Sequence, residues 1–189
     1  MKHVFLTLIA SLCLSGCAVL SFSDNLPKAM LDQDDPEIVR AGAPAFLIIL
    51  DALVKGDPND EDFLLAAAKL YGSYAGAFVN GEPERAKKLS SRAMDYARRA
   101  TCEELEDLCV VLDKPFDDFA AVLAEYDDED ELPYIYGLAG AWAGWIQANS
   151  GDWGAIAQLP KVKALVQHVL KIDEAYDQGT AHIYMGVLE

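Results

Sequence analysis

The sequence predicts an all-α fold of stacked helical hairpins. Apolar residues recur at helical spacing, and the alternating polar and apolar pattern of strands is absent. Proline and acidic residues stand where helices should begin, and Gly or Asn-Gly where they should end. Helix pairs return at intervals of roughly 34 residues, with Ala and Gly at the expected crossings. This spacing is typical of an α-solenoid similar to tetratricopeptide repeats.

The bounds of the first two helices are predicted from the proline, glycine and acidic residues at their ends. Asp35-Pro36-Glu37 opens a helix that Gly56 ends, and Pro44 is expected to restart or kink it. The run 45–50 is apolar all round, which predicts that this helix is buried. A second helix follows Asp57-Pro58-Asn59 and runs to about residue 79. Its two glycines, at 72 and 76, predict that another backbone passes close by.

The remaining helices are predicted in the same way. Glu82-Pro83-Glu84 begins an amphipathic third helix with a stripe of alanines facing inward. A fourth is expected over residues 114–126 with Phe116 inward, and a fifth from Pro133 to about residue 149. Pro160 opens another helix, and Thr180 caps a last one.

Composition excludes several partners. The chain has 189 residues, 52% of them hydrophobic, and its net charge is -16. An acidic surface repels phosphate backbones, so we expect no nucleic-acid partner. It also lacks the basic patch that would hold the body on anionic lipid, so any membrane contact must come from another feature.

The N-terminus supplies that feature. Lys2 precedes an apolar run of about eleven residues, which suits a signal peptide and is too short to span a membrane. Leu14-Ser15-Gly16-Cys17 resembles the bacterial lipobox, and the resemblance implies cleavage before Cys17 and its acylation. The alternative is an ordinary signal peptide with a chance cysteine. Ala18 resembles an outer-membrane sorting residue, which predicts a lipid anchor on the periplasmic face of that membrane.

Three segments result from this organisation. Residues 1–16 are predicted to be the signal peptide, and residues 17–35 the lipidated N-terminus and a polar tether. Residues 36–189 form the helical domain.

The helical domain resembles a known family. Residues 42–53, 142–147, 156–162 and 172–179 look like the T component of the tetratricopeptide-associated TRAP transporters, tripartite ATP-independent periplasmic transporters. The resemblance implies a periplasmic lipoprotein without enzyme activity that forms a homotrimer. It also implies docking to the substrate-binding P component and help in passing a hydrophobic or organic-acid ligand. A rival hypothesis is a scaffold lipoprotein that assembles envelope complexes without handling a ligand.

The chain departs from this family at its end. It stops at residues 185–189, inside what resembles the first helix of a hairpin, and the family continues with a partner helix. The resemblance therefore predicts a C-terminally shortened form whose last repeat is incomplete.

Five aromatic residues are candidates for a ligand or partner face. They concentrate within twenty residues, and the alternative is core packing between repeats. Two of them, three residues apart, share one helix face and could line a hydrophobic cavity. The five residues are Tyr134, Tyr136, Trp142, Trp145 and Trp153.

Cys102 and Cys109 are candidates for a disulfide, because an exported compartment permits one. Seven residues on one continuous helix would separate their Cα atoms by about 10 Å, beyond the ~7 Å limit for a bond. Thr101 and Glu104 resemble a capping box, which would make the following segment helical. A bond therefore requires a bend between the cysteines, and both outcomes remain open.

Catalytic and cofactor motifs are missing from the sequence. No nucleophile elbow, zinc spacing or phosphate-binding glycine loop occurs, so we expect no enzyme, no metal and no cofactor. The acidic run 127–131 could bind calcium but lacks the spacing of an EF-hand, and a solvated helix start is the favoured interpretation. His168, on a helix expected to be exposed, and His182 are expected to be structural or solvent-facing.

Overall fold

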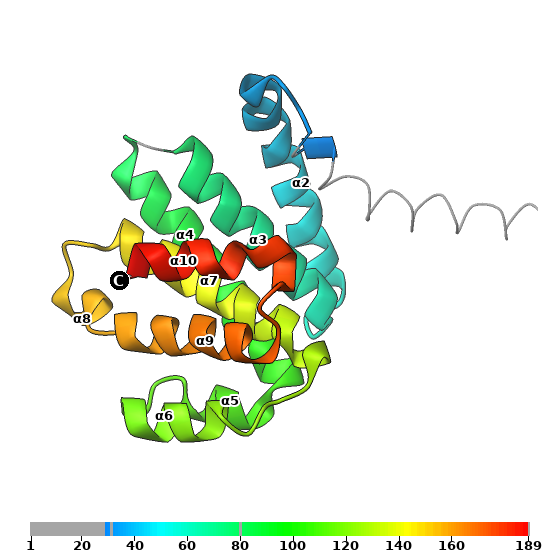
Figure 1. The fold of residues 1–189 in the computed structure, drawn as a ribbon. Coiled ribbons are helices and arrows are strands. Elements are labelled where there is room, and N and C mark those ends of the chain that lie inside the picture. The colour runs from blue at the N-terminus through cyan, green and yellow to red at the C-terminus, as the bar shows by residue number, and fades with distance from the viewer. Residues whose placement is uncertain (1–28, 31, 80, 189) are drawn as a thin grey trace, which may run out of the picture. The chain divides into compact units, whose positions relative to one another are not determined.

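The computed structural model describes residues 29–30, 32–79 and 81–188, and it contains helices and no strand within these ranges (Figure 1). The chain divides into two units, one ending at Ala43 and one beginning at Pro44. Helix α2 (Pro36–Gly56) crosses that boundary. The predicted signal peptide and Cys17 lie outside the described residues. The all-α prediction is confirmed.

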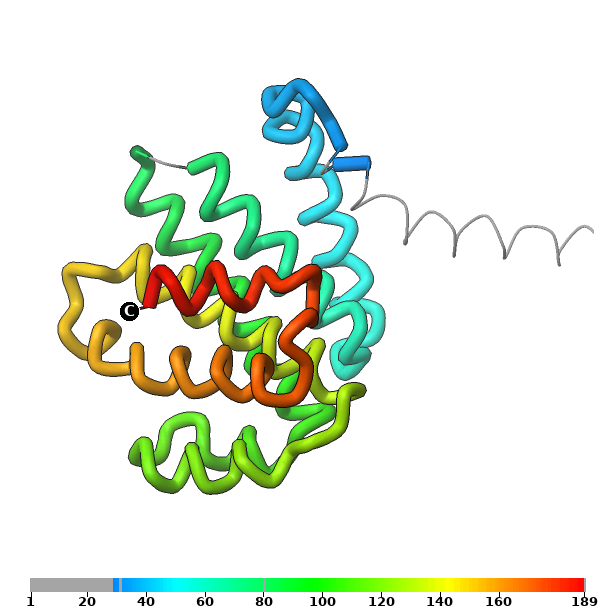
Figure 2. Tube along the Cα trace, viewed as in Figure 1, coloured from blue at the N-terminus to red at the C-terminus, as the bar shows by residue number. Residues whose placement is uncertain are grey.

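Helices α3 (Glu61–Phe78) and α4 (Pro83–Glu104) form a hairpin, as the trace in Figure 2 shows. The Asp60 carboxylate caps α3 by accepting a hydrogen bond from the Phe63 backbone N–H at 2.8 Å. The turn between the helices uses Gly81 at φ 91°, a conformation that glycine adopts without a steric penalty. Small buried residues bring the two helices together: Ala67, Ala68, Ala93 and Ala97.

The second half of the chain adds one long central helix and shorter elements around it. Helix α7 packs against α3, α4 and α9, and α9 packs in turn against α10. This succession of neighbours is consistent with a solenoid-like stack of helices. The elements are α5 (Glu106–Val111), α6 (Phe116–Leu123), η1 (Glu129–Glu131), α7 (Leu132–Ala148), α8 (Trp153–Ile156), α9 (Leu159–Ile172), η2 (Tyr176–Gly179) and α10 (Thr180–Leu188).

A glycine sets the close approach between α3 and α7. A Cβ built on Gly137 would stand 2.4 Å from Cδ1 of Leu65, far inside van der Waals contact. Leu65 is buried, so its side chain has little room to move away. An alanine at position 137 would therefore force the Leu65 side chain to shift within its buried site.

The structure corrects two expectations about α2. The helix continues through Pro44 as one element, so Pro44 does not restart it. Within the apolar run 45–50 only Leu47 is buried, because Ile48 is 69% and Ile49 50% exposed. A helix segment with apolar residues on every side has no polar face to mark the side exposed to solvent. The apolar composition of the run therefore does not show which residues are buried.

Two further expectations fail for individual side chains. Phe116 was predicted to point inward, but it is the first residue of α6 and is 43% exposed. Gly72 does lie near another helix, since a Cβ there would be 3.8 Å from Cβ of Ala93. Gly76 has nothing within 4 Å of the same position, so no backbone passes close to it.

Candidate functional site

The five predicted aromatic residues occupy different environments. Trp142 is 1% exposed and belongs to the core, where its Nε1–H donates to Oε1 of Gln158 at 2.7 Å. Its ring meets that of Phe119 edge-on, with centroids 6.2 Å apart. Trp153 on α8 is 86% exposed. A surface that includes both of these side chains cannot exist, so the five do not make one face.

The other members of the predicted set are half-buried. Trp145 follows Trp142 on α7 and keeps part of its surface in solvent. Burial raises the pKa of Tyr134 to about 12, and the carboxylates of Glu104 and Asp62 add to that shift. Tyr136 differs from both because it belongs to a cluster formed by four segments, α3, α7, η2 and α10.

We define the tyrosine cluster as Tyr136, Tyr176, Tyr184, Lys69 and Asp177. The Tyr136 ring on α7 meets those of Tyr176 and Tyr184 edge-on, at centroid distances of 5.4 Å and 5.8 Å. A Cβ at Gly140 would lie 3.4 Å from the Tyr184 hydroxyl, and one at Gly137 would lie 3.9 Å from Cε of Lys69. Helices α3 and α10 and the short helix η2 thus bring these groups to one side of α7.

The Tyr136 hydroxyl is unusual within this cluster. It is buried, and it has no hydrogen-bond partner within the part of the chain that the structure describes. Burial raises the pKa of Tyr136, and Tyr184 and Asp177 raise it further. The hydroxyl therefore stays protonated at neutral pH, and the nearby Asp177 carboxylate does not meet it with the geometry of an ordinary hydrogen bond.

Lys69 and Asp177 give the cluster its charges. Part of the Lys69 side chain is exposed, but desolvation lowers the pKa of its ammonium while Asp177 opposes that shift. Asp177 lies in η2 at φ 49°, and Gln178 follows at φ 60°. Left-handed conformations at two successive residues other than glycine are uncommon and cost free energy.

A second carboxylate faces tyrosines elsewhere in the same unit. Asp51 on α2 accepts hydrogen bonds from the hydroxyls of Tyr71 at 2.8 Å and Tyr96 at 2.7 Å. Arg92 forms an ion pair with Asp51 at 3.1 Å and lies over both tyrosine rings. We call these four residues the Asp51 cluster. Every group in it is paired, so it connects α2 to the α3–α4 hairpin.

Cys102 and Cys109 are joined by a disulfide in the structure, with their Cα atoms 4.8 Å apart. The bend that this bond requires is at Leu105, whose φ of -122° and ψ of 65° separate α4 from α5. The predicted capping box is wrong, because the Thr101 hydroxyl donates to the Ala97 carbonyl from inside α4. Leu105 and Leu108 are buried, so packing of both side chains explains the bend that the local sequence does not reveal.

His168 is buried rather than placed on an exposed helix as expected. Its Nε2 lies 2.6 Å from the Tyr126 carbonyl oxygen, and burial lowers the pKa of the ring. The neutral imidazole thus holds the segment before η1 against α9, which is a structural role. His182 is exposed, in agreement with its expected place.

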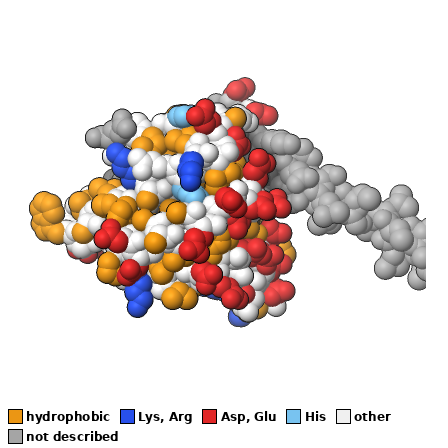
Figure 3. Space-filling model, turned by 60° about the horizontal axis from the view of Figure 1, so that its bottom comes forward, with side chains coloured by type: hydrophobic (Ala, Val, Ile, Leu, Met, Phe, Trp, Pro, Cys, Tyr) orange, Lys and Arg blue, Asp and Glu red, His pale blue; other side chains and the backbone are white. Residues whose placement is uncertain are grey.

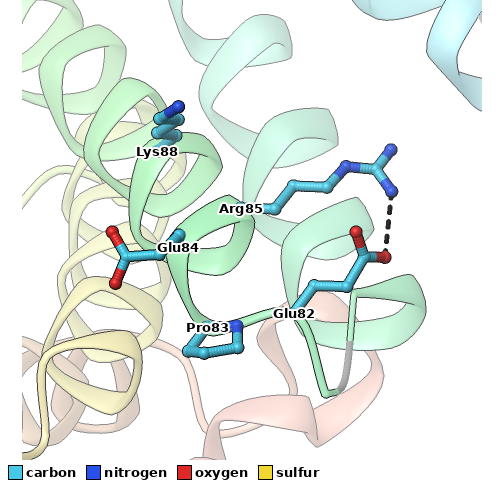
Figure 4. Close-up of a pocket in the computed structure, with 5 residues that line it drawn as sticks. All are labelled: Glu82, Pro83, Glu84, Arg85 and Lys88. Atoms are coloured by element: carbon cyan, nitrogen blue, oxygen red, sulfur yellow. Dashed lines mark hydrogen bonds and ion pairs between the residues drawn. The ribbon is translucent and has the colours of Figure 1, made fainter.

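The pocket in Figure 4 is a shallow groove on the first turn of α4, between Glu82, Pro83, Glu84, Arg85 and Lys88. Its charges are exposed, and Arg85 pairs with Glu82 at 3.1 Å. Figure 3 shows apolar side chains beside many acidic ones on one face of the molecule. Among the residues described, no group of three or more His, Cys, Asp or Glu side chains could hold a metal ion.

A comparison with protein-family models shows the family of this chain. The model of the TRAP transporter T-component family matches residues 32–189. The chain belongs to this family. A search of curated proteins finds no match.

Membership in the T-component family makes the chain an accessory component of a TRAP transporter. The family is not a known enzyme family, and a component of such a transporter is a membrane-associated periplasmic protein. In the described residues, each helix is too short or too polar to cross a bilayer. Four site residues were missed by sequence reasoning, because no periodicity or motif in the sequence joins them to Tyr136: Lys69, Tyr176, Asp177 and Tyr184.

Proposed function

We propose that this T-component is a lipid-anchored homotrimer that docks to the substrate-binding P component and helps to pass a hydrophobic or organic-acid ligand. The family match over residues 32–189 is the observation that carries the proposal. The anchor is the acyl group on Cys17 that the lipobox implies, in the outer membrane. Export to the periplasm agrees with the Cys102–Cys109 disulfide, since such bonds persist in oxidising compartments.

Trp153 is the strongest candidate for contact with the P component. It is 86% exposed, so the large apolar area of its side chain is in contact with water. Tryptophan is also enriched among the residues that dominate binding energy at protein interfaces. The Asp152 carboxylate accepts a hydrogen bond from the Gly154 backbone N–H at 2.8 Å and so orders the turn that presents Trp153.

A binding measurement tests this proposal. The lipid-free body, residues 18–189, is titrated with the P component of a TRAP transporter. We expect Trp153→Ala to weaken binding by about tenfold or more, which corresponds to about 1.4 kcal/mol. Val110→Ala is the control, because Val110 is 69% exposed and lies on another helix. An absence of binding by the unaltered body would favour the general scaffold instead.

The anchor and the trimer have separate tests. Labelled palmitate should enter the full chain and fail to enter Cys17→Ser. Sedimentation of the lipid-free body should give a mass three times that of the chain. A monomer at every concentration measured would exclude the trimer while leaving the docking result intact.

A further inference from the structure

The tyrosine cluster contains a buried hydroxyl that has no hydrogen-bond partner of ordinary geometry among the described residues. The Tyr136 hydroxyl is buried, Cε of Lys69 lies 3.9 Å from a Cβ built on the adjacent Gly137, and Asp177 acts on both Lys69 and Tyr136. Burial raises the pKa of Tyr136, Tyr176 and Tyr184, so all three phenols stay protonated at neutral pH. A carboxylate satisfies such a set best, because each of its oxygens accepts more than one hydrogen bond and its charge pairs with the ammonium.

Asp177 brings a carboxylate of the chain itself toward these donors. Its charge acts on Lys69 and on all three tyrosines of the cluster. Even so, the Tyr136 hydroxyl remains without a hydrogen bond of ordinary geometry. Asp177 therefore approaches the position of an acceptor without filling it.

The backbone around Asp177 departs from a regular helix. Asp177, Gln178 and Gly179 are all left-handed, with φ values of 49°, 60° and 76°. The turn is held by the Gly179 N–H, which donates to the Ala175 carbonyl at 3.2 Å, and by the Thr180 hydroxyl, which donates to the Asp177 carbonyl at 2.6 Å. Asp177 and Gln178 are exposed. Strain of this kind collects at active sites, ligand clamps and switch regions.

We propose that the tyrosine cluster is a binding site for the carboxylate of a small organic acid, and that Asp177 is a built-in competitor which the ligand displaces. The ligand carboxylate accepts from the Tyr136 hydroxyl and pairs with the Lys69 ammonium. Its apolar body lies against the rings of Tyr176 and Tyr184. The turn 177–179 moves to admit it, because the Tyr136 hydroxyl is closed off from solvent in this arrangement. This inference deepens the ligand-passing part of the proposed function and rests on it.

The test measures binding of two carboxylate probes, benzoate and octanoate, to the full chain in detergent by calorimetry. Asp177→Asn removes the competing charge, and asparagine tolerates the left-handed conformation as aspartate does. We expect it to tighten binding of at least one probe by about tenfold, as removal of an internal competitor should. Benzamide, which has no charge, should change by less than about twofold.

Matched variants identify the site. Glu174→Gln removes the same charge from an exposed position three residues earlier and should leave the affinity unchanged. Adding Tyr136→Phe or Lys69→Met to Asp177→Asn should abolish the gain. If Asp177→Asn does not fold by circular dichroism, Asp177→Gly takes its place, since glycine prefers this turn.

Three results would overturn the site: neither probe binds Asp177→Asn more tightly than the unaltered chain, benzamide gains as much as benzoate, or Tyr136→Phe keeps the gain. Docking of the P component is measured on the same variants. Loss of docking in Trp153→Ala with unchanged benzoate affinity separates the two functions. A tightened benzoate affinity without any docking would refute the proposed partner alone.

Discussion

Two regions of this T-component each bring an aspartate close to tyrosine side chains and a cation, but the hydrogen bonding of the tyrosines differs between them. In the Asp51 cluster both tyrosine hydroxyls donate to the carboxylate within 2.8 Å and Arg92 pairs with it. In the tyrosine cluster Asp177 affects every group, yet the Tyr136 hydroxyl remains unpaired. Asp51 lies within a long regular helix, whereas Asp177 lies in a left-handed turn. The same side chains thus give a structural link where the backbone is regular and an unfilled site where it is strained.

The largest difference between the two regions should appear when each carboxylate is removed. Asp51→Ala leaves two hydroxyls and a guanidinium without their acceptor, and we expect it to lower the free energy of unfolding by about 2–3 kcal/mol. Asp177→Asn should change it by less than about 0.5 kcal/mol. Urea denaturation of both variants measures these values. Equal losses would mean that the two aspartates have the same role.

The contact between α3 and α7 that supports the tyrosine cluster can be broken at Gly137. A methyl group there meets the buried Leu65, so Gly137→Ala should cost about 1–3 kcal/mol by overpacking. Gly144 lies on the same helix with nothing within 4 Å of its Cβ position. Gly144→Ala should therefore stabilise the fold by about 0.5–1 kcal/mol. Thermal unfolding of the pair decides this, and a destabilised Gly144→Ala would contradict the explanation.

Removing single hydroxyls sharpens the comparison. Tyr71→Phe loses a hydrogen bond to a charged acceptor, and a loss of about 1.5 kcal/mol is expected. Tyr136→Phe removes a hydroxyl that has no partner, so its stability should stay within about 0.5 kcal/mol or rise. Chemical denaturation compares them directly. A large loss in Tyr136→Phe would show that its hydroxyl is paired after all.

The smallest effect is expected from a change of pH. The free energy of unfolding should stay nearly constant around neutral pH and should fall increasingly above pH 10. Burial raises the pKa of Tyr71 and Tyr136 above the ordinary value of 10.0, and that of Tyr134 to about 12. The folded state therefore holds protons that the unfolded state releases. The stabilisation is complete below pH 10 and is lost as pH rises through the folded values. Tyrosinate absorbance should show Tyr134 ionising near pH 12, and its absence from Tyr134→Phe is the control.

Local features of the sequence predicted the helices well. Asp60 caps α3, Pro83 begins α4, and Pro133 and Pro160 stand in the first turns of α7 and α9. Each of these signals acts within a few residues, so neighbouring side chains are sufficient to determine it. The candidate site was less predictable. Of the tyrosine cluster only Tyr136 was singled out, because Lys69 and Tyr184 reach it through packing of α3 and α10 that sequence spacing does not encode.

The sequence by itself therefore determined that the chain is helical, where most helices begin, and which residues resemble the T-component family. Tertiary structure decided that Trp142 is buried while Trp153 is exposed, and that a bend at Leu105 brings Cys102 to Cys109. The physical reason is the range of the forces involved. Capping and backbone preference act between neighbours in the chain, whereas burial and pairing depend on which distant helices come into contact.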